Sequence, residues 1–144
     1  MTGVAVLNYA GEVLHTEQHR FRDEPHARPI AFRDFLDFLI GPWGKIDAVV
    51  FEMPFAASYA ATASHHELIA ALRICCHDRQ VPYFWVNTST LRKSMGIAGR
   101  KSVDVKAAIA EWYRRGGERP EVSQDEMDAT LVGCWYLMAR GMME

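Results

Sequence analysis

Three acidic residues of this 144-residue chain are spaced as if to hold a divalent metal ion. Glu52 closes the apolar run from Ile46 to Phe51, and Asp125 and Asp128 stand three positions apart at the start of an apolar helical pattern. Mg²⁺ takes oxygen ligands in near-octahedral geometry, which a carboxylate at a buried strand end and two on one helical face can supply. These residue types and this spacing make a metal-dependent nuclease the first candidate.

A capping-box pattern predicts where the two aspartates point. Ser123 and Glu126 have the spacing at which an N-cap serine and a glutamate three residues later bond each other's backbone N–H groups. Asp128 shares a helical face with apolar residues that pack inward, namely Leu131, Val132 and Trp135. A carboxylate on such a face is costly to desolvate unless a cation or several donors meet it.

Each of these residues also has a plainer interpretation. Asp125 would then be a first-turn acid that interacts with the helix dipole. Glu52 would be a charged residue that leaves a strand for a solvated loop. The metal hypothesis is stronger for the three residues together, because strand ends and helix faces converge at one edge of an α/β sheet.

A basic segment lies in the second half of the chain. Positions 92 to 119 hold eight of the 16 Lys and Arg residues against three acidic ones: Arg92, Lys93, Arg100, Lys101, Lys106, Arg114, Arg115 and Arg119. Because the whole chain carries a net charge of −2, a surface for phosphates must come from such local clustering. The alternative is that these are ordinary solvated charges on a helix and its approach loop.

Phe55 is a further candidate for contact with nucleic acid. Aromatic rings stack on unpaired bases without sequence preference, so this ring could act as a wedge at a branch point. The interpretation we favour for Phe55 is a buried loop anchor.

The hydrophobic patterns predict an α/β fold. Residues 3–7 and 12–18 are β-rich runs joined by Asn8-Tyr9-Ala10-Gly11, a sequence that favours a tight hairpin. The remaining patterns predict helices over 29–40, 58–77, 103–115 and 124–140, and strands over 45–52 and 83–86. The resulting order, β-β-α-β-α-β-α-α, indicates a mixed sheet with a hairpin and parallel crossover strands, flanked by helices.

Composition limits the class of protein. A chain of 144 residues with 49% hydrophobic side chains fits a single domain over residues 1–144. The three cysteines are an odd number and two are adjacent, which favours buried, reduced thiols in a cytoplasmic protein. No stretch approaches the roughly 18 apolar residues of a membrane span, and the first residues lack the pattern of a signal peptide, so no membrane partner is expected.

Taken in order, several motifs resemble those of RuvC-type Holliday junction resolvases. They are Thr2-Gly3-Val4-Ala5-Val6-Leu7 with Gly11-Glu12-Val13-Leu14, the strand that ends in Glu52, Leu91-Arg92-Lys93-Ser94-Met95-Gly96, and Asp125-Glu126-Met127-Asp128-Ala129. The resemblance spans nearly the whole chain. It implies an RNase H-like fold and a homodimer that cuts branched DNA with Mg²⁺ or Mn²⁺, without a small-molecule cofactor. Compact proteins of this family are common in phages and bacteria.

The resemblance also implies roles for individual residues. Glu52 takes the place of the family's strand-end glutamate, and Asp125 and Asp128 take the places of its C-terminal pair. Lys106 is the expected contact to a phosphate near the metal ions, because the family places a lysine in this helix. The charge clustering of the basic segment, and not the resemblance, makes Arg92, Lys93, Arg100 and Lys101 the expected contacts to the DNA backbone. Phe55 is the candidate contact to unpaired bases.

One departure from the family's pattern is serious. The first catalytic aspartate of the family ends a central strand just before the Thr-Gly motif, and this sequence begins at that motif. Either the chain starts late and lacks that strand, which we favour, or residues 3–7 are the first strand and Asn8 takes the aspartate position. Both versions leave a weaker metal site. An inactive nucleic-acid-binding relative and a nuclease for RNA hybrids therefore stay open beside the junction endonuclease.

Overall fold

The computed structural model describes residues 2–22, 24–53, 59–117 and 119–142, with the side chains of residues 59–62 left aside. These residues form two compact units. The hairpin unit comprises residues 1–20 and 88–144, and the parallel-strand unit comprises residues 21–87. The expected single domain over residues 1–144 stays a prediction, and each unit is described by itself.

The hairpin unit begins with two antiparallel strands, β1 (Thr2–Leu7) and β2 (Val13–His19). The register pairs Thr2 with His19 and shifts between Val6 and Leu7. The side-chain oxygen of Asn8 accepts hydrogen bonds of 3.0 Å from the backbone N–H groups of both Ala10 and Glu12, which closes the turn. The predicted hairpin is therefore confirmed, with asparagine in the local role that suits it in turns.

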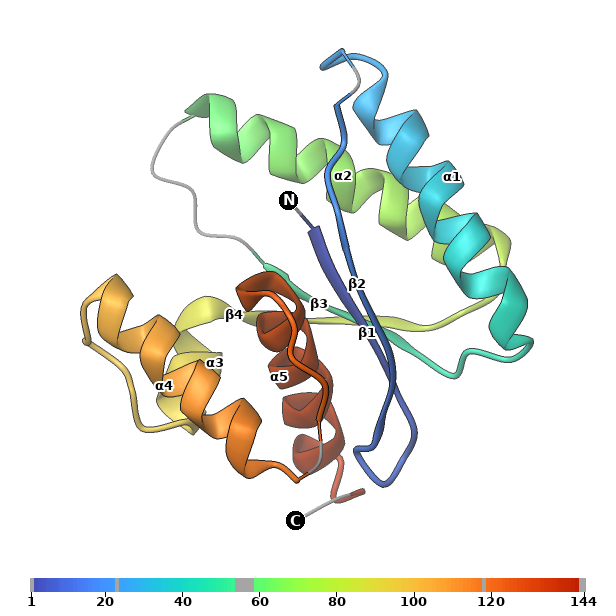
Figure 1. Ribbon diagram of the computed structural model, residues 1–144. Helices are drawn as coiled ribbons and strands as arrows, with labels where there is room; N and C mark the ends of the chain where they lie inside the picture. Colours follow the sequence, from blue (N-terminus) through green and yellow to red (C-terminus); the bar gives the residue numbers. More distant parts are fainter. Residues whose placement is uncertain (1, 23, 54–58, 118, 143–144) are drawn as a thin grey trace. The chain divides into compact units, whose positions relative to one another are not determined.

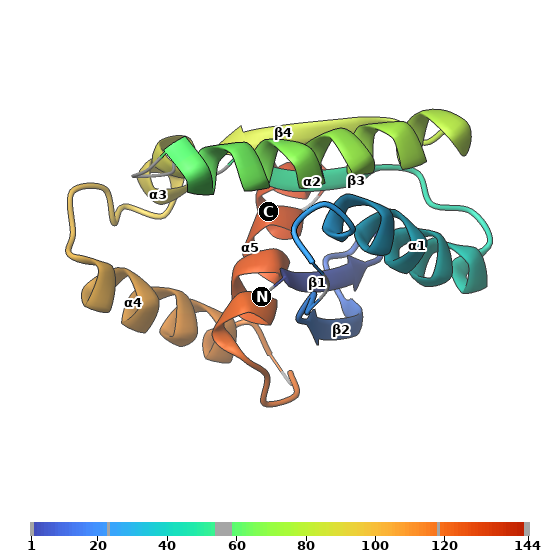
Figure 2. The same ribbon diagram turned by 90° about the horizontal axis from the view of Figure 1, so that it is seen from above.

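Three helices complete the hairpin unit: α3 (Thr88–Ser94), α4 (Ser102–Arg115) and α5 (Gln124–Ala139). Figures 1 and 2 show α5 running alongside the β1–β2 hairpin, against which it packs. Its inward face is apolar and fully packed, with Leu131, Val132, Cys134 and Leu137 all buried. The hydroxyl of the buried Thr130 donates to the Glu126 carbonyl oxygen over 2.9 Å, so this polar group is satisfied within the helix.

The parallel-strand unit contains α1 (Arg28–Ile40), a short 3₁₀ turn η1 (Gly41–Trp43), β3 (Val49–Met53), α2 (Tyr59–Asp78) and β4 (Tyr83–Asn87). Strands β3 and β4 pair in parallel, with Val49 opposite Tyr83 and Glu52 opposite Val86. The crossover between them is α2, as the connection of parallel strands requires. Arg73 of α2 lies over the Tyr83 and Trp85 rings, 5.7 Å from each centroid, so α2 covers that face of the strand pair.

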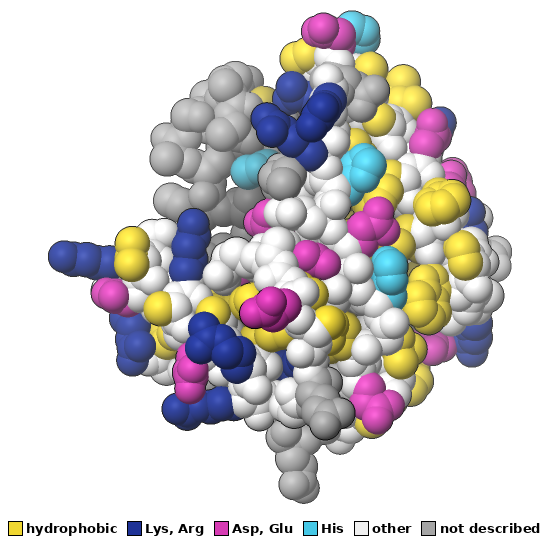
Figure 3. All heavy atoms as spheres, in the orientation of Figure 1, with side chains coloured by type: hydrophobic (Ala, Val, Ile, Leu, Met, Phe, Trp, Pro, Cys, Tyr) yellow, Lys and Arg dark blue, Asp and Glu magenta, His cyan; other side chains and the backbone are white. Residues whose placement is uncertain are grey.

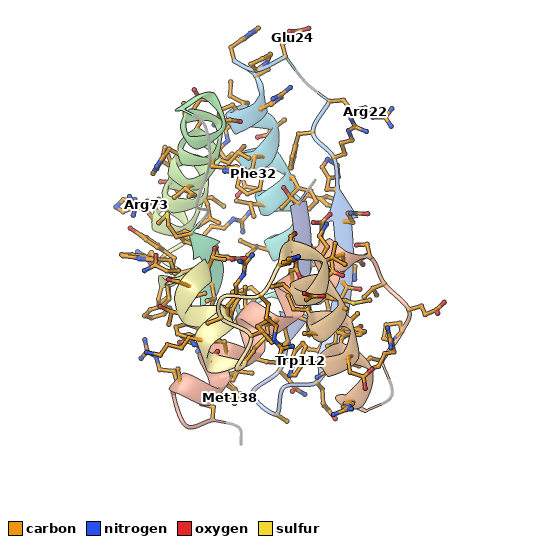
Figure 4. All side chains as sticks on the ribbon, turned by 90° about the vertical axis from the view of Figure 1, so that its left-hand side faces the viewer. Arg22, Glu24, Phe32, Arg73, Trp112 and Met138 are labelled. Atoms are coloured by element: carbon orange, nitrogen blue, oxygen red, sulfur yellow. The ribbon has the colours of Figure 1, made fainter. Side chains whose placement is uncertain are left out.

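Helices α1 and α2 pack against each other within this unit. Phe32 lies between them (Figure 4), and its ring meets that of Phe21 edge to face at 5.4 Å. At the far end, the Arg79 Nε donates to the Asp37 carboxylate over 2.8 Å. This hydrogen bond is the largest cause of the lowered pKa of Asp37. The apolar face predicted for residues 29–40 is thus confirmed as the face toward α2.

The predicted order of elements is confirmed, with two differences. The strand expected over residues 45–52 begins only at Val49, because its partner β4 starts at Tyr83 and the first ladder bond runs from the Val49 N–H to the Pro82 carbonyl. Helix α3 was not predicted, since it spans seven residues and buries only Leu91. Neither difference alters the fold class, a mixed α/β arrangement with a hairpin and parallel strands flanked by helices.

The three cysteines are buried free thiols, as the sequence predicts. Burial, followed by a hydrogen bond to Asp37, raises the pKa of the Cys75 thiol to about 11. Among the helices of the described part of the chain, none combines the length and the apolar character needed to cross a bilayer.

Candidate active site

The start of α5 is fixed by a reciprocal cap. The Ser123 hydroxyl accepts a hydrogen bond from the Glu126 N–H, and the Glu126 carboxylate accepts one from the Ser123 N–H over 3.0 Å. The predicted capping box is confirmed. Because the first helical turn is held in this way, Asp125 and Asp128 occupy defined positions one turn apart, and both side chains are half-buried.

Each aspartate accepts a hydrogen bond from a glutamine amide. Gln18 of β2 donates from Nε2 to Asp125 Oδ2 over 2.6 Å, which links the hairpin to the first turn of α5. Gln124 donates from Nε2 to Asp128 Oδ1 over 2.9 Å, across one turn of the same helix. Neutral donors of this kind orient a carboxyl group and bring no charge of their own to the site. Carboxylate oxygens are ligands that a hard divalent cation prefers.

Glu52 lies at the carboxyl end of β3, one residue before the strand ends, and it is half-buried. The register places it beside Val86 of β4, on the opposite side of the strand pair from Phe51 and Trp85. Within the described ranges, no group of three or more acidic, histidine or cysteine side chains is placed to hold a metal ion. Glu52 belongs to the parallel-strand unit and the two aspartates to the hairpin unit, so their convergence stays a prediction.

The five cations singled out on sequence all belong to α3, α4 and the segment between them. Lys93, Arg100, Lys101 and Lys106 are exposed, and Arg92 is half-buried. In the part of the chain that the structure describes, none of the five takes part in an ion pair. Lys and Arg side chains stand out around α4 in Figure 3. We call these five residues the basic patch.

The other three basic residues of the segment have local structural partners. Arg115 and Arg114 form ion pairs with Glu111 at 2.7 and 3.2 Å. The Arg119 guanidinium lies over the rings of Trp112 and Tyr113, 5.0 and 5.1 Å from their centroids, and donates to the Tyr113 carbonyl oxygen. These contacts hold the C-terminal end of α4. The charge available to a polyanion therefore lies at the other end of the segment, in the basic patch.

The comparisons with known proteins bear on the fold. No protein-family model matches the sequence, and no curated protein matches it. Solved structures do match: one of Thermus thermophilus RuvC and one of T. thermophilus RuvC in complex with Holliday junction substrate. Each match covers 90% of this chain and 79% of the RuvC chain at 14% sequence identity, with TM-scores of 0.65 and 0.68. The fold is RuvC-like. At this identity, the likeness establishes the fold alone.

Phe55, Lys106 and Asn8 are the remaining residues that the sequence singled out. Phe55 lies outside the described residues, so its role as a base wedge or a loop anchor stays a prediction. Lys106 is exposed on α4, and its contact to a phosphate stays a prediction. Asn8 uses its side-chain oxygen in the hairpin turn, and its amide nitrogen donates to the Glu12 carboxylate. Its amide thus has a turn-closing role.

The sequence did not point to Gln18 or Gln124. Gln18 is separated from Asp125 by 107 positions, and no motif connects the two. Gln124 could have been found, because a glutamine four residues before an aspartate in a helix is spaced for a side-chain hydrogen bond.

Proposed function

We propose that this chain is a RuvC-like endonuclease that cleaves phosphodiester bonds in Holliday junctions or other branched DNA, with Mg²⁺ or Mn²⁺ as cofactor. One observation carries the proposal: two half-buried aspartates stand one turn apart at the capped start of α5 in a RuvC-like fold. One of the matching structures is a RuvC complex with Holliday junction substrate, which makes branched DNA the first substrate to test.

The donor set suits a hard divalent cation. Asp125 and Asp128 offer carboxylate oxygens from one helix, and Glu52 is the third proposed ligand, from the end of β3. When bound, the ions would supply an activated water and stabilise the leaving 3′-oxygen. The convergence of Glu52 with the aspartates is part of the proposal. In this proposal, Gln18 and Gln124 keep the two aspartates oriented through their amide hydrogen bonds.

The basic patch is the proposed surface for the DNA backbone. Four of its five side chains are exposed, and cations without local ion pairs in the described ranges can bind phosphates by releasing condensed counterions. Lys106 is the proposed contact to a phosphate beside the metal ions, and Phe55 a proposed contact to unstacked bases. A homodimer in the cytoplasm would present two such sites to the two halves of a junction.

A second candidate is a nucleic-acid-binding protein on the same fold without catalysis. The specific observation in its favour is that both aspartates already accept amide hydrogen bonds, at 2.6 and 2.9 Å. A carboxylate satisfied in this way has less need of a cation. If this second candidate is correct, the basic patch binds DNA and the acidic residues stabilise α5.

Cleavage of a labelled four-way junction distinguishes the two candidates. The natural chain is incubated with Mg²⁺ and with Mn²⁺, beside Asp125→Asn, Asp128→Asn and Glu52→Gln. A linear duplex and an RNA–DNA hybrid of matched length serve as alternative substrates. We expect junction cleavage by the natural chain and a loss of at least about 100-fold in each variant, as removal of a metal ligand predicts. Junction binding without cleavage under either ion would instead establish the second candidate. Preferential cleavage of the hybrid would identify a different nuclease.

A further inference from the structure

The hairpin presents one of its faces to the first turn of α5. Side chains alternate along a strand, so Thr16 and Gln18 of β2 point to the same side. Gln18 reaches Asp125 over 2.6 Å, and a hydrogen bond from Thr16 is among the causes that lower the pKa of the Glu126 carboxyl. This side of β2 therefore bonds two successive residues of α5.

Gly3 makes this approach possible. The register pairs Gly3 of β1 with Gln18 of β2, so the two residues stand at the same level of the hairpin. A Cβ atom on Gly3 would lie 2.0 Å from the Asp125 carbonyl oxygen and 2.8 Å from the Glu126 nitrogen. Both are backbone atoms that cannot rotate away. Only a residue without a side chain lets the strand come this close.

The contact restricts the Asp125 side chain. Gln18 donates to Oδ2, and within the described part of the chain this is the hydrogen bond that the Asp125 carboxylate accepts. With one oxygen held, the rotation of the carboxylate is limited and Oδ1 is directed to a fixed place. The donor comes from a strand rather than a loop, and strands hold such geometry more rigidly.

We infer that Gln18 is a positioning residue for Asp125. We also infer that Gly3 lets the hairpin approach α5 closely enough for the Gln18 amide to reach the Asp125 carboxylate. The inference rests on the proposed function in one respect, the assignment of Asp125 as a metal ligand. Hydrogen-bond partners that orient metal ligands typically change metal affinity by 10- to 100-fold when they are removed. Gln18 is such a partner, contributed by the hairpin.

The test uses the full chain and Mn²⁺ alone as the probe. Gln18→Leu keeps the approximate size of the side chain and removes the donor, while Gln18→Thr suits a strand and is too short to reach Asp125. Gln80→Leu, the same chemical change at an exposed position of the other unit, is the matched control. Mn²⁺ affinity is measured by calorimetric titration. Three-bond couplings of the Asp125 side chain are measured by NMR in the metal-free protein.

We expect either Gln18 variant to weaken Mn²⁺ binding by at least about tenfold, with Gln80→Leu within twofold of the natural chain. The couplings should show one Asp125 rotamer in the natural chain and averaging in the Gln18 variants. Unchanged couplings in a folded Gln18 variant would overturn the inference, even if metal binding occurs. Equal Mn²⁺ affinity of the natural chain and Asp125→Asn would instead overturn the metal-site proposal, and the couplings would still decide the role of Gln18.

Discussion

Ser123 and Glu126 cap α5 reciprocally: the serine hydroxyl accepts from the Glu126 N–H, and the glutamate accepts from the Ser123 N–H and hydroxyl at 3.0 and 2.7 Å. Ser123→Ala removes the cap and should destabilise the protein by about 1 kcal/mol. In a chain of this length, that corresponds to a fall of about 3 °C in melting temperature. Ser102→Ala, at an exposed first-turn serine of α4 that does not cap, is the control and should leave the melting temperature unchanged.

The same cap predicts a dependence of stability on pH. Burial opposes ionisation of Glu126, but hydrogen bonds from Ser123 and Thr16 outweigh it and lower the pKa of the carboxyl. A carboxyl with a lowered folded-state pKa stabilises the fold above its unfolded value of ~4.3, and this contribution disappears as pH falls through the folded-state pKa. Glu126→Gln retains an acceptor but not the charge. It should therefore be less stable than the natural chain at pH 7, and the difference should narrow as the pH falls through the folded-state pKa of Glu126, as thermal melts would show.

The basic patch predicts which cations bind DNA. Replacing Arg100 and Lys101 together by Gln should lower the slope of log affinity against log salt by about 2 for a four-way junction, because two phosphate contacts are lost. Fluorescence anisotropy over a salt series in EDTA measures this slope without cleavage. Arg114→Gln with Arg115→Gln is the matched control, since both arginines pair with Glu111. An equal change of slope in the two double variants would contradict the assignment of the patch.

Most of the fold could be predicted because its elements carry strong local signals. The hairpin has a turn in which Asn8 closes the chain, α5 has a reciprocal cap, and α1 has a continuous apolar face toward α2. The local sequence did not predict features that depend on a distant partner or on a very short element. The start of β3 at Val49 is set by where β4 begins, and α3 is too short for a helical period to show.

The site was predictable only in part, because some of its contacts also depend on residues that are far apart in the sequence. Residue type and spacing pointed to Asp125 and Asp128, which the structure places one turn apart at the capped start of α5. Nothing local connects Gln18 with Asp125, because their hydrogen bond depends on the packing of a strand against a helix. Local charge counts likewise included Arg119, whose guanidinium instead packs on the Trp112 ring.

The close approach of β1 to α5 predicts the effect of the smallest possible side chain at Gly3. Gly3→Ala places a methyl group 2.0 Å from the Asp125 carbonyl oxygen, so strand and helix must separate. Overpacking of this kind costs about 1–3 kcal/mol, which urea unfolding would measure. Gly41→Ala is the control, because nothing lies within 4 Å of its added Cβ. A Gly3→Ala chain as stable as the natural one would show that the hairpin and α5 do not pack this closely.

Gln18→Glu tests metal binding by Asp125, because it adds a possible second metal ligand beside that residue. The substitution replaces the amide donor by a second carboxylate at hydrogen-bond distance from Asp125. Without metal, the two like charges repel and the melting temperature at pH 7 should fall. With Mg²⁺ or Mn²⁺ present, the pair forms a stronger site for a hard cation, so the ion should raise the melting temperature more than in the natural chain. Gln18→Leu provides the contrast, because it lacks the added charge and should respond less to the ion than the natural chain. If Gln18→Glu and Gln18→Leu respond alike to added metal, Asp125 does not bind the ion.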